Sequence, residues 1–183
     1  MPDYTYTGGK FVPTAGGTTI DPAGGFTSTL VSRTAGSPTK IMAVGDSITL
    51  GQGSERTGGW RMFLWQMLTD AGFYYTPVGW NTSNPIMPYD VTYPRRGSGH
   101  ASYGGWKIQD HLDQVAGRTG RTAGNPLGSD GIGAWIATYN PDLLIVNLGT
   151  NNAAVDSSTV RQQAMSDFAT AVFAAKPTVN VVW

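Results

Sequence analysis

The chain has 183 residues and a formal net charge of zero, and 40% of its residues are hydrophobic while only 13% are charged. It contains no cysteine, which excludes disulfides, thiolate metal sites and a cysteine nucleophile. No basic stripe is present and no apolar run approaches the ~18 residues of a membrane span, so we expect neither a nucleic-acid nor a membrane partner.

The N-terminal segment differs in composition from the rest of the chain. Residues 1–38 are rich in Gly, Thr, Ser and Pro and show no sustained period of 3.6 or 2. We predict a leader or linker there, followed by a single domain over residues 39–183. The N-terminus lacks the charged and apolar regions of a signal peptide, so none is visible in the sequence.

The first elements of the domain follow from its apolar pattern. Residues 40–45 are predicted to form a buried strand. Gly58-Gly59 is expected to open a helix that Gly72 ends, and residues 73–79 form a second predicted strand. We expect this helix to lie on the sheet through an apolar stripe, formed by Trp60, Phe63, Leu64, Met67 and Leu68.

The middle of the chain combines a long connection with short helices. Residues 80–103 form a polar connection, and such a loop in a compact domain is usually functional or forms a wall around a site. A helix is predicted within residues 103–115, with its first turn at Gly105. Residues 132–139 are predicted to form a short helix that ends at Asn140-Pro141.

The last part of the chain repeats the strand and helix pattern. Residues 143–148 are almost all apolar, which is typical of a parallel strand buried on both faces. A helix over residues 160–175 and a strand over 179–183 follow. The alternation of strands and helices predicts a doubly wound α/β fold with a parallel sheet.

Polar residues follow two of these strands directly, as Gly45-Asp46-Ser47 and Gly149-Thr150-Asn151-Asn152. The carboxyl ends of parallel strands share one edge of the sheet, where ligands bind in open α/β folds. Ser47 is therefore a candidate nucleophile, which needs an adjacent base. We expect Asp46 to accept backbone N–H bonds at the turn.

A serine nucleophile also needs donors for the oxyanion of its tetrahedral intermediate. The side-chain amide of Asn151 and the backbone N–H groups of Gly105 and Ser47 are candidate donors, with Gly104 as the alternative to Gly105. A plainer interpretation also exists for the two side chains. Ser47 is then only a cap or turn residue after a strand, and Asn151 is only a turn residue.

The motifs that carry these candidates resemble those of the SGNH or GDSL hydrolases. Gly45-Asp46-Ser47-Ile48-Thr49 is similar to the first block of that family, Gly104-Gly105-Trp106 to the second and Gly149-Thr150-Asn151-Asn152 to the third. Asn152 stands where the family more usually has Asp. The resemblance implies a three-layer, flavodoxin-like α/β/α fold, catalytic roles for Ser47, Gly105 and Asn151, and supporting roles for Asp46, Gly104 and Asn152.

Further motifs resemble carbohydrate esterase family three in particular. They are Gly58-Gly59-Trp60-Arg61, the segment from Gly99-His100 to Trp106, and Pro141-Asp142. This resemblance implies hydrolysis of small acyl esters, in particular acetyl esters on polysaccharides, without a metal or organic cofactor. It also implies an exported protein, although the sequence leaves localisation and oligomeric state open.

The fourth block of the family, Asp-x-x-His, has no counterpart in the chain. The two histidines are His100 and His111, and neither has an Asp three residues before it. We therefore expect the fold to be incomplete at its C-terminal end, before the last strand and the catalytic histidine. The alternative is a catalytically inactive module of the same fold that binds carbohydrate or serves a structural role.

His100, His111 and Trp80 also have interpretations that do not involve catalysis. His100 is either a support of its loop or a substitute base, and His111 is expected on the flank of a helix. Trp80 lies in the long connection, where it either stacks on a sugar or packs against the protein.

Overall fold

The computed structural model describes residues 4–7, 10–13, 38–53, 58–82, 99–112 and 131–183. The chain divides into two compact units, Met1–Ser37 and Pro38–Trp183. In the first unit, β1 (Tyr4–Thr7) pairs antiparallel with β2 (Lys10–Pro13). We predicted only a leader or linker here, because strands of four residues are too short to show a period.

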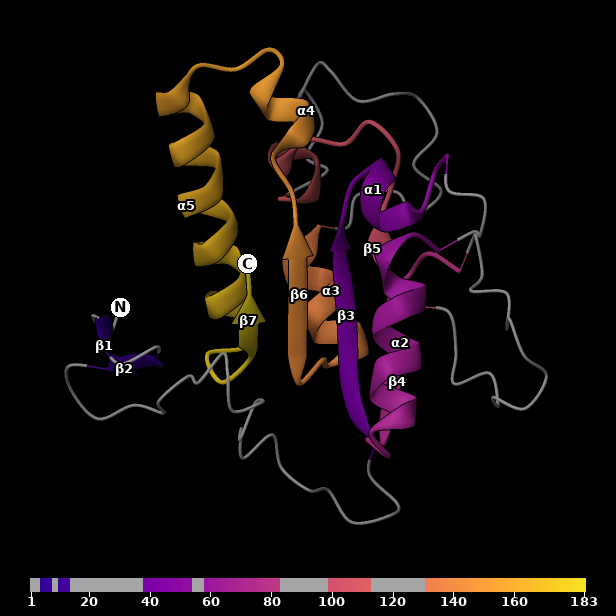
Figure 1. Cartoon of the computed structure of the whole chain (residues 1–183). Coiled ribbons are helices and arrows are strands. Elements are labelled where there is room, and N and C mark those ends of the chain that lie inside the picture. The colour runs from indigo at the N-terminus through magenta and orange to yellow at the C-terminus, as the bar shows by residue number, and fades with distance from the viewer. Residues whose placement is uncertain (1–3, 8–9, 14–37, 54–57, 83–98, 113–130) are drawn as a thin grey trace. The chain divides into compact units, whose positions relative to one another are not determined.

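The second unit is built on a five-stranded parallel sheet (Figure 1). Its first strand in the chain, β3 (Thr39–Gly45), lies in the middle, between β4 (Tyr75–Pro77) and β6 (Leu143–Asn147), and β7 (Asn180–Val182) pairs with β6. This order is that of the flavodoxin-like doubly wound folds. The predicted α/β class is confirmed.

Two short strands share one side of β3. β4 pairs with the beginning of β3, at Thr39–Ile41, whereas β5 (Ala101–Ser102) pairs with its end, at Val44 and Gly45. The strand predicted over residues 73–79 is thus shorter than expected, and β5 was not predicted because two residues show no periodicity. β5 brings the segment of the second motif block to the end of β3.

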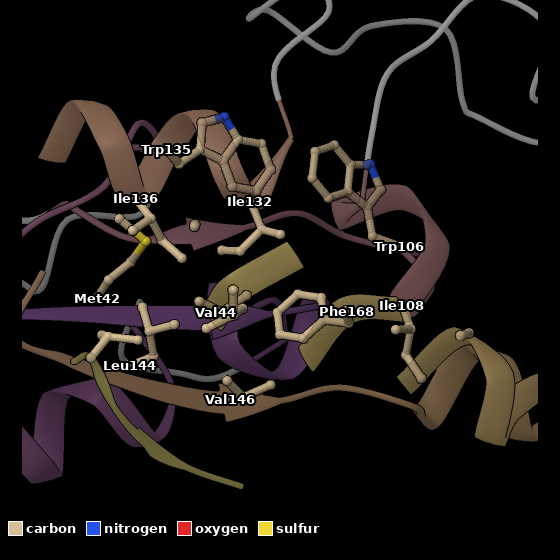
Figure 2. Close-up of a cluster of buried hydrophobic side chains, with 14 residues drawn as sticks. Met42, Val44, Trp106, Ile108, Ile132, Trp135, Ile136, Leu144, Val146 and Phe168 are labelled. Atoms are coloured by element: carbon tan, nitrogen blue, oxygen red, sulfur yellow. The ribbon is translucent and has the colours of Figure 1, made fainter. Parts of the chain in front are cut away.

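Helices cover both faces of the sheet, which gives three layers. α2 (Trp60–Asp70) packs on one face, where Trp65 joins residues of β3 and β6. α3 (Ile132–Tyr139) and α5 (Ser158–Ala175) cover the other. Figure 2 shows this second face, where side chains from strands and helices meet in one cluster that includes Met42, Val44, Trp106, Trp135, Leu144, Val146 and Phe168.

The predicted apolar stripe of α2 is wrong in part. Phe63 and Met67 are 61% and 68% exposed, so they face solvent. The buried face instead carries Arg61, Met62 and Trp65. The prediction from the apolar pattern failed because Arg61 is buried and interrupts the apolar period. The residues that accept hydrogen bonds from Arg61 lie in another part of the chain.

The remaining helices agree with the sequence except around the second and third motif blocks. α3 has the predicted bounds, and α5 begins two residues earlier than predicted. The helix expected from Gly105 is instead a short 3₁₀ turn, η1 (Ile108–His111), and Val115 lies outside the described residues. α4 (Thr150–Ala153) was not predicted. In the described part of the chain, no helix is long and apolar enough to cross a membrane.

Candidate active site

Ser47 is the first residue of α1 (Ser47–Leu50), a single helical turn that follows β3. It is half-buried. Asp46 caps this turn, because its Oδ1 accepts a hydrogen bond from the backbone N–H of Ile48 over 2.9 Å. Asp46 thus makes the backbone contact expected of it, and it is fully buried.

Gly45 allows the chain to turn tightly at the end of β3. A Cβ on this residue would lie 2.7 Å from the carbonyl oxygen of Asn147 and would overlap the side chain of Thr49. Any larger residue would therefore push α1 away from the sheet. The glycine places Ser47 directly above the edge where β3 and β6 end.

A buried arginine holds the other end of α1. Arg61 donates from Nε to the carbonyl oxygen of Thr49 over 2.6 Å and from Nη2 to that of Leu50 over 3.2 Å. These carbonyls belong to the last turn of a helix, where a cation is favourable. Burial lowers the pKa of Arg61 to about 10, which leaves it charged at neutral pH. Trp60 adds a bond from Nε1 to Thr49 Oγ1 over 3.2 Å.

The second block runs along the end of β3 and then turns. The N–H of Tyr103 donates to the carbonyl oxygen of Gly45 over 3.2 Å, which extends the pairing of β5 with β3. Gly104 lies against the side chain of Gln52, whose Oε1 would be 2.6 Å from a Cβ at this position. Gly105 has φ +77°, a left-handed conformation that favours glycine, and it is exposed.

The third block begins the turn α4 after β6. Asn151, half-buried, donates from its side-chain Nδ2 to the backbone carbonyl oxygen of Trp106 over 2.8 Å. This bond joins the third block to the residue that follows Gly105. Asn152 is fully buried and faces away into a polar cluster, so it is not placed to meet a ligand directly.

The sheet register brings the three blocks to one level. Gly45 is the partner of Ser102 in β5 on one side and of Asn147 in β6 on the other. The chain leaves all three strands at this edge, and Figure 1 shows α1 and α4 beyond the same end of the sheet. A hydroxyl, a backbone amide turn and a side-chain amide are thus gathered at the carboxyl ends of adjacent strands.

A charged group, Asp156, lies in the connection between α4 and α5 and contacts the second and third blocks. Asp156 accepts hydrogen bonds from Asn152 and Lys107, and both interactions favour its charged form. The bond from Asn152, followed by Lys107 and Gln109, holds the pKa of Asp156 below its ordinary value. The backbone N–H of Lys107 also donates to Asp110 Oδ2 over 2.8 Å, which caps η1.

Both histidines lie inside the protein. His100 is fully buried, with Nδ1 2.7 Å from Ser102 Oγ. His111, the last residue of η1, is also fully buried and makes edge contacts with Trp106, Trp135 and Phe168, so it lies on a helix as predicted but faces the core. Its burial could not be read from the sequence, because Trp135 and Phe168 come from distant segments.

Trp80 belongs to the same aromatic cluster. Its ring lies 6.5 Å from that of Tyr103, 5.8 Å from that of Trp106 and 5.7 Å from that of Trp135, measured between centroids. Trp80 thus packs against the protein and is half-buried, as one of its two interpretations expected. Among the described residues, no group of three or more His, Asp or Glu side chains is placed to hold a metal ion.

Comparisons with known proteins agree with this architecture. No family model matches the chain. The chain is 29% identical over 136 residues to a multidomain esterase of Ruminococcus flavefaciens, which is 70% of this chain and 17% of that protein. The structure of this chain is similar to that of a family 3 carbohydrate esterase of Clostridium thermocellum, with a TM-score of 0.60 and 26% sequence identity. The match covers 79% of this chain and 60% of the Clostridium chain.

A second solved structure extends the comparison. The chain is similar in fold to a carbohydrate esterase family 3 protein from Talaromyces cellulolyticus, with a TM-score of 0.57, 24% identity, and coverage of 78% of this chain and 59% of that one. The resemblance to carbohydrate esterase family three that the motifs predicted is thus confirmed, as is the SGNH-type fold. The chain spans about 60% of the length of these solved relatives.

Proposed function

We propose that this chain carries the nucleophile and the oxyanion donors of an SGNH-type serine esterase, which hydrolyses small acyl esters. The observation that carries the proposal is the hydrogen bond from Asn151 to the carbonyl oxygen of Trp106. It links the segment of Gly105 to the turn after β6, beside the strand end that bears Ser47. The esterases to which the chain is similar support the same reaction class.

In this proposal Ser47 Oγ attacks the carbonyl carbon of the ester and transfers its proton to a histidine base. The negative charge that develops on the carbonyl oxygen is stabilised by the backbone N–H groups of Ser47 and Gly105 and by the amide of Asn151. The bond to the alcohol then breaks, and the alcohol takes the proton from the histidine. Water attacks the acyl-serine in the same way and releases the carboxylic acid.

The base is the one group that the described site does not supply. His100 and His111 are both fully buried, and His100 already contacts Ser102. We therefore propose that the histidine comes from outside these 183 residues, as an Asp-x-x-His segment. The aspartate would orient the imidazole and stabilise its charged form.

For the substrate we propose acetyl esters on polysaccharides. The proposal rests on the resemblance of the motifs to carbohydrate esterase family three and on the similarity to the Clostridium enzyme. Hydrolysis in this site needs only side chains and backbone amides, so we propose no metal or organic cofactor.

The test is ester hydrolysis by the full-length protein, measured with 4-nitrophenyl acetate and acetylated xylan. Ser47→Ala is expected to abolish turnover, while the matched control Ser158→Ala, at an exposed position in α5, is expected to keep it. Equal rates in the two variants would contradict the proposed nucleophile. If the full-length protein binds xylan but does not hydrolyse it, the alternative of an inactive carbohydrate-binding module is favoured. That alternative is tested because both histidines are buried.

A further inference from the structure

Four polar side chains next to the proposed oxyanion donors form one hydrogen-bonded group. We term this group the Asp156 cluster; it consists of Lys107, Gln109, Asn152 and Asp156. Lys107 Nζ lies 3.3 Å from Asp156 Oδ1, and Asn152 Nδ2 donates to Asp156 Oδ2 over 2.8 Å. Gln109 Nε2 is 3.5 Å from the same Oδ2. The carboxylate thus joins two segments that are far apart in sequence, 107–109 and 152–156.

Asn152 completes the connection from inside. Its Oδ1 accepts a hydrogen bond from the backbone N–H of Ile108 over 2.9 Å, and its Nδ2 donates to Gln109 Oε1 over 2.7 Å as well as to Asp156. Both hydrogens of the amide are therefore used, and its oxygen is too. A fully buried amide satisfied in this way has one orientation, because any other would leave polar atoms unpaired.

Asp156 is itself fixed in place. Arg161, one turn along in α5, donates from Nη1 to the backbone carbonyl oxygen of Asp156 over 2.9 Å. The carboxylate is mostly shielded, with 14% of its side chain exposed. An ion pair of this kind, with several hydrogen bonds on one carboxylate, holds its geometry better than an isolated surface pair.

The two segments that Asp156 joins are those that carry the proposed donors. Lys107 follows Trp106, whose carbonyl accepts from Asn151, and Trp106 follows Gly105. Asn152 follows Asn151 in the turn α4. A shift of either segment would therefore change the direction of the Asn151 amide and of the Gly105 turn together.

We propose that Asp156 is a positioning residue for the oxyanion donors: its carboxylate clamps residues 107–109 to α4 and so fixes the Asn151 amide against the Trp106 carbonyl. This inference rests on the proposed function, in which those donors stabilise the transition state. Asp156 touches no substrate in this account. Its effect passes through Asn152 and Lys107.

The charge at position 156 also determines what position 152 tolerates. The Asn152 amide nitrogen lies 2.8 Å from an oxygen of Asp156. An aspartate at 152 would place two carboxylates in direct contact, which is unfavourable. In the double variant N152D/D156N, position 152 carries the carboxylate and position 156 carries the amide. The contact between the two side chains is then again one carboxylate with one amide, so we expect the double variant to restore the cluster.

The experiment compares D156A, N152D, D156N and N152D/D156N in the full-length protein, with the exposed Asp167→Ala on α5 as matched control. We expect D156A to lower kcat by about tenfold to a hundredfold with KM nearly unchanged, because donors displaced by a fraction of an ångström lose their effect in the transition state only. N152D alone is expected to be at least as damaging, and the double exchange to recover kcat to within about threefold of wild type. Rates are measured well below the thermal midpoint of each variant, so that a loss of stability does not enter.

The side-chain amide signals of Asn151 in a ¹⁵N NMR spectrum give a second readout that needs no activity. They are assigned by their disappearance in Asn151→Asp, and we expect them to shift or broaden in D156A and N152D but not in Asp167→Ala. If D156A leaves both the Asn151 side-chain amide signals and kcat unchanged, the inference is overturned. It is also overturned if the loss of kcat in N152D/D156N equals the product of the losses in the two single variants. If wild-type protein hydrolyses no ester, the proposed function fails, and the Asn151 signals alone decide whether Asp156 positions this amide.

Discussion

The side-chain amide of Asn151 donates a hydrogen bond to the backbone carbonyl oxygen of Trp106, 2.8 Å away. The two residues are 45 positions apart in sequence. Only the pairing of β5 and β6 with opposite sides of β3 brings them together. Since an amide nitrogen carries two hydrogens, the bond orients the group while using one of them.

Removing this amide is expected to reduce catalysis and leave substrate binding nearly intact. For Asn151→Ala we predict a fall in kcat of about 10²–10³ with little change in KM, the size found when one oxyanion donor is lost. Steady-state hydrolysis of 4-nitrophenyl acetate by the full-length protein measures this. Asn180→Ala, at an exposed position in β7, is the matched control. Equal kcat values in the two variants would remove Asn151 from the proposed donors.

Two glycines are predicted to respond oppositely to the same substitution. In Gly45→Ala the new Cβ would meet the Asn147 carbonyl and the Thr49 side chain, so we expect a loss of about 3 kcal/mol in the free energy of unfolding. In Gly133→Ala the Cβ would meet nothing within 4 Å, inside α3. We expect that variant to gain about 0.5–1 kcal/mol, because alanine restricts the unfolded chain. Urea unfolding measures both, and equal shifts would contradict the tight turn at Gly45.

The buried arginine of α2 is predicted to matter more than its exposed phenylalanine. Arg61→Met leaves the carbonyls of Thr49 and Leu50 without these donors, so we expect a loss of about 3 kcal/mol in the free energy of unfolding. Phe63→Ala on the same helix is expected to change it by less than about 0.5 kcal/mol. The reverse order in urea unfolding would show that α2 faces the sheet by the stripe predicted from sequence.

Asp156 is predicted to give the stability a specific pH dependence. Its pKa is lowered in the folded state, chiefly by the hydrogen bond from Asn152. The carboxylate therefore stabilises the fold fully above its ordinary pKa of 3.8, and this contribution is lost as the pH falls through the lowered folded-state value. We expect Asp156→Asn to have a lower thermal midpoint than wild type at pH 6, and the difference to shrink toward pH 3. A difference independent of pH, or the same trend in Asp167→Asn, would contradict this assignment.

The sequence was sufficient to predict the elements that are either continuously apolar or have a regular apolar repeat. β3 and β6 are continuous apolar runs in the centre of the sheet, and the helix over residues 132–139 ends before Asn140-Pro141, as predicted from the proline. Ser47 and Asn151 were placed at strand ends because apolar runs stop directly before their motifs. Local pattern and tertiary structure agree at these positions.

The sequence was insufficient where the decisive partners come from elsewhere in the chain. β5 is a strand only because the end of β3 offers it an edge, and Arg61 is buried only because α1 presents carbonyls to it. His111 is buried in part by the rings of Trp135 and Phe168, which come from two distant helices. The Asp156 cluster carried no local signal either, since its two halves meet only after the sheet has formed.

The central claim is that Ser47 is a nucleophile held at the end of β3. The most direct measurement is labelling of the full-length protein with a serine-reactive phosphonate, followed by mass spectrometry of its peptides. We predict a single adduct, on the peptide that contains Ser47, and its loss in Ser47→Ala. The account would be contradicted if the probe left Ser47 unlabelled while it labelled other serines as readily as it does in unfolded protein.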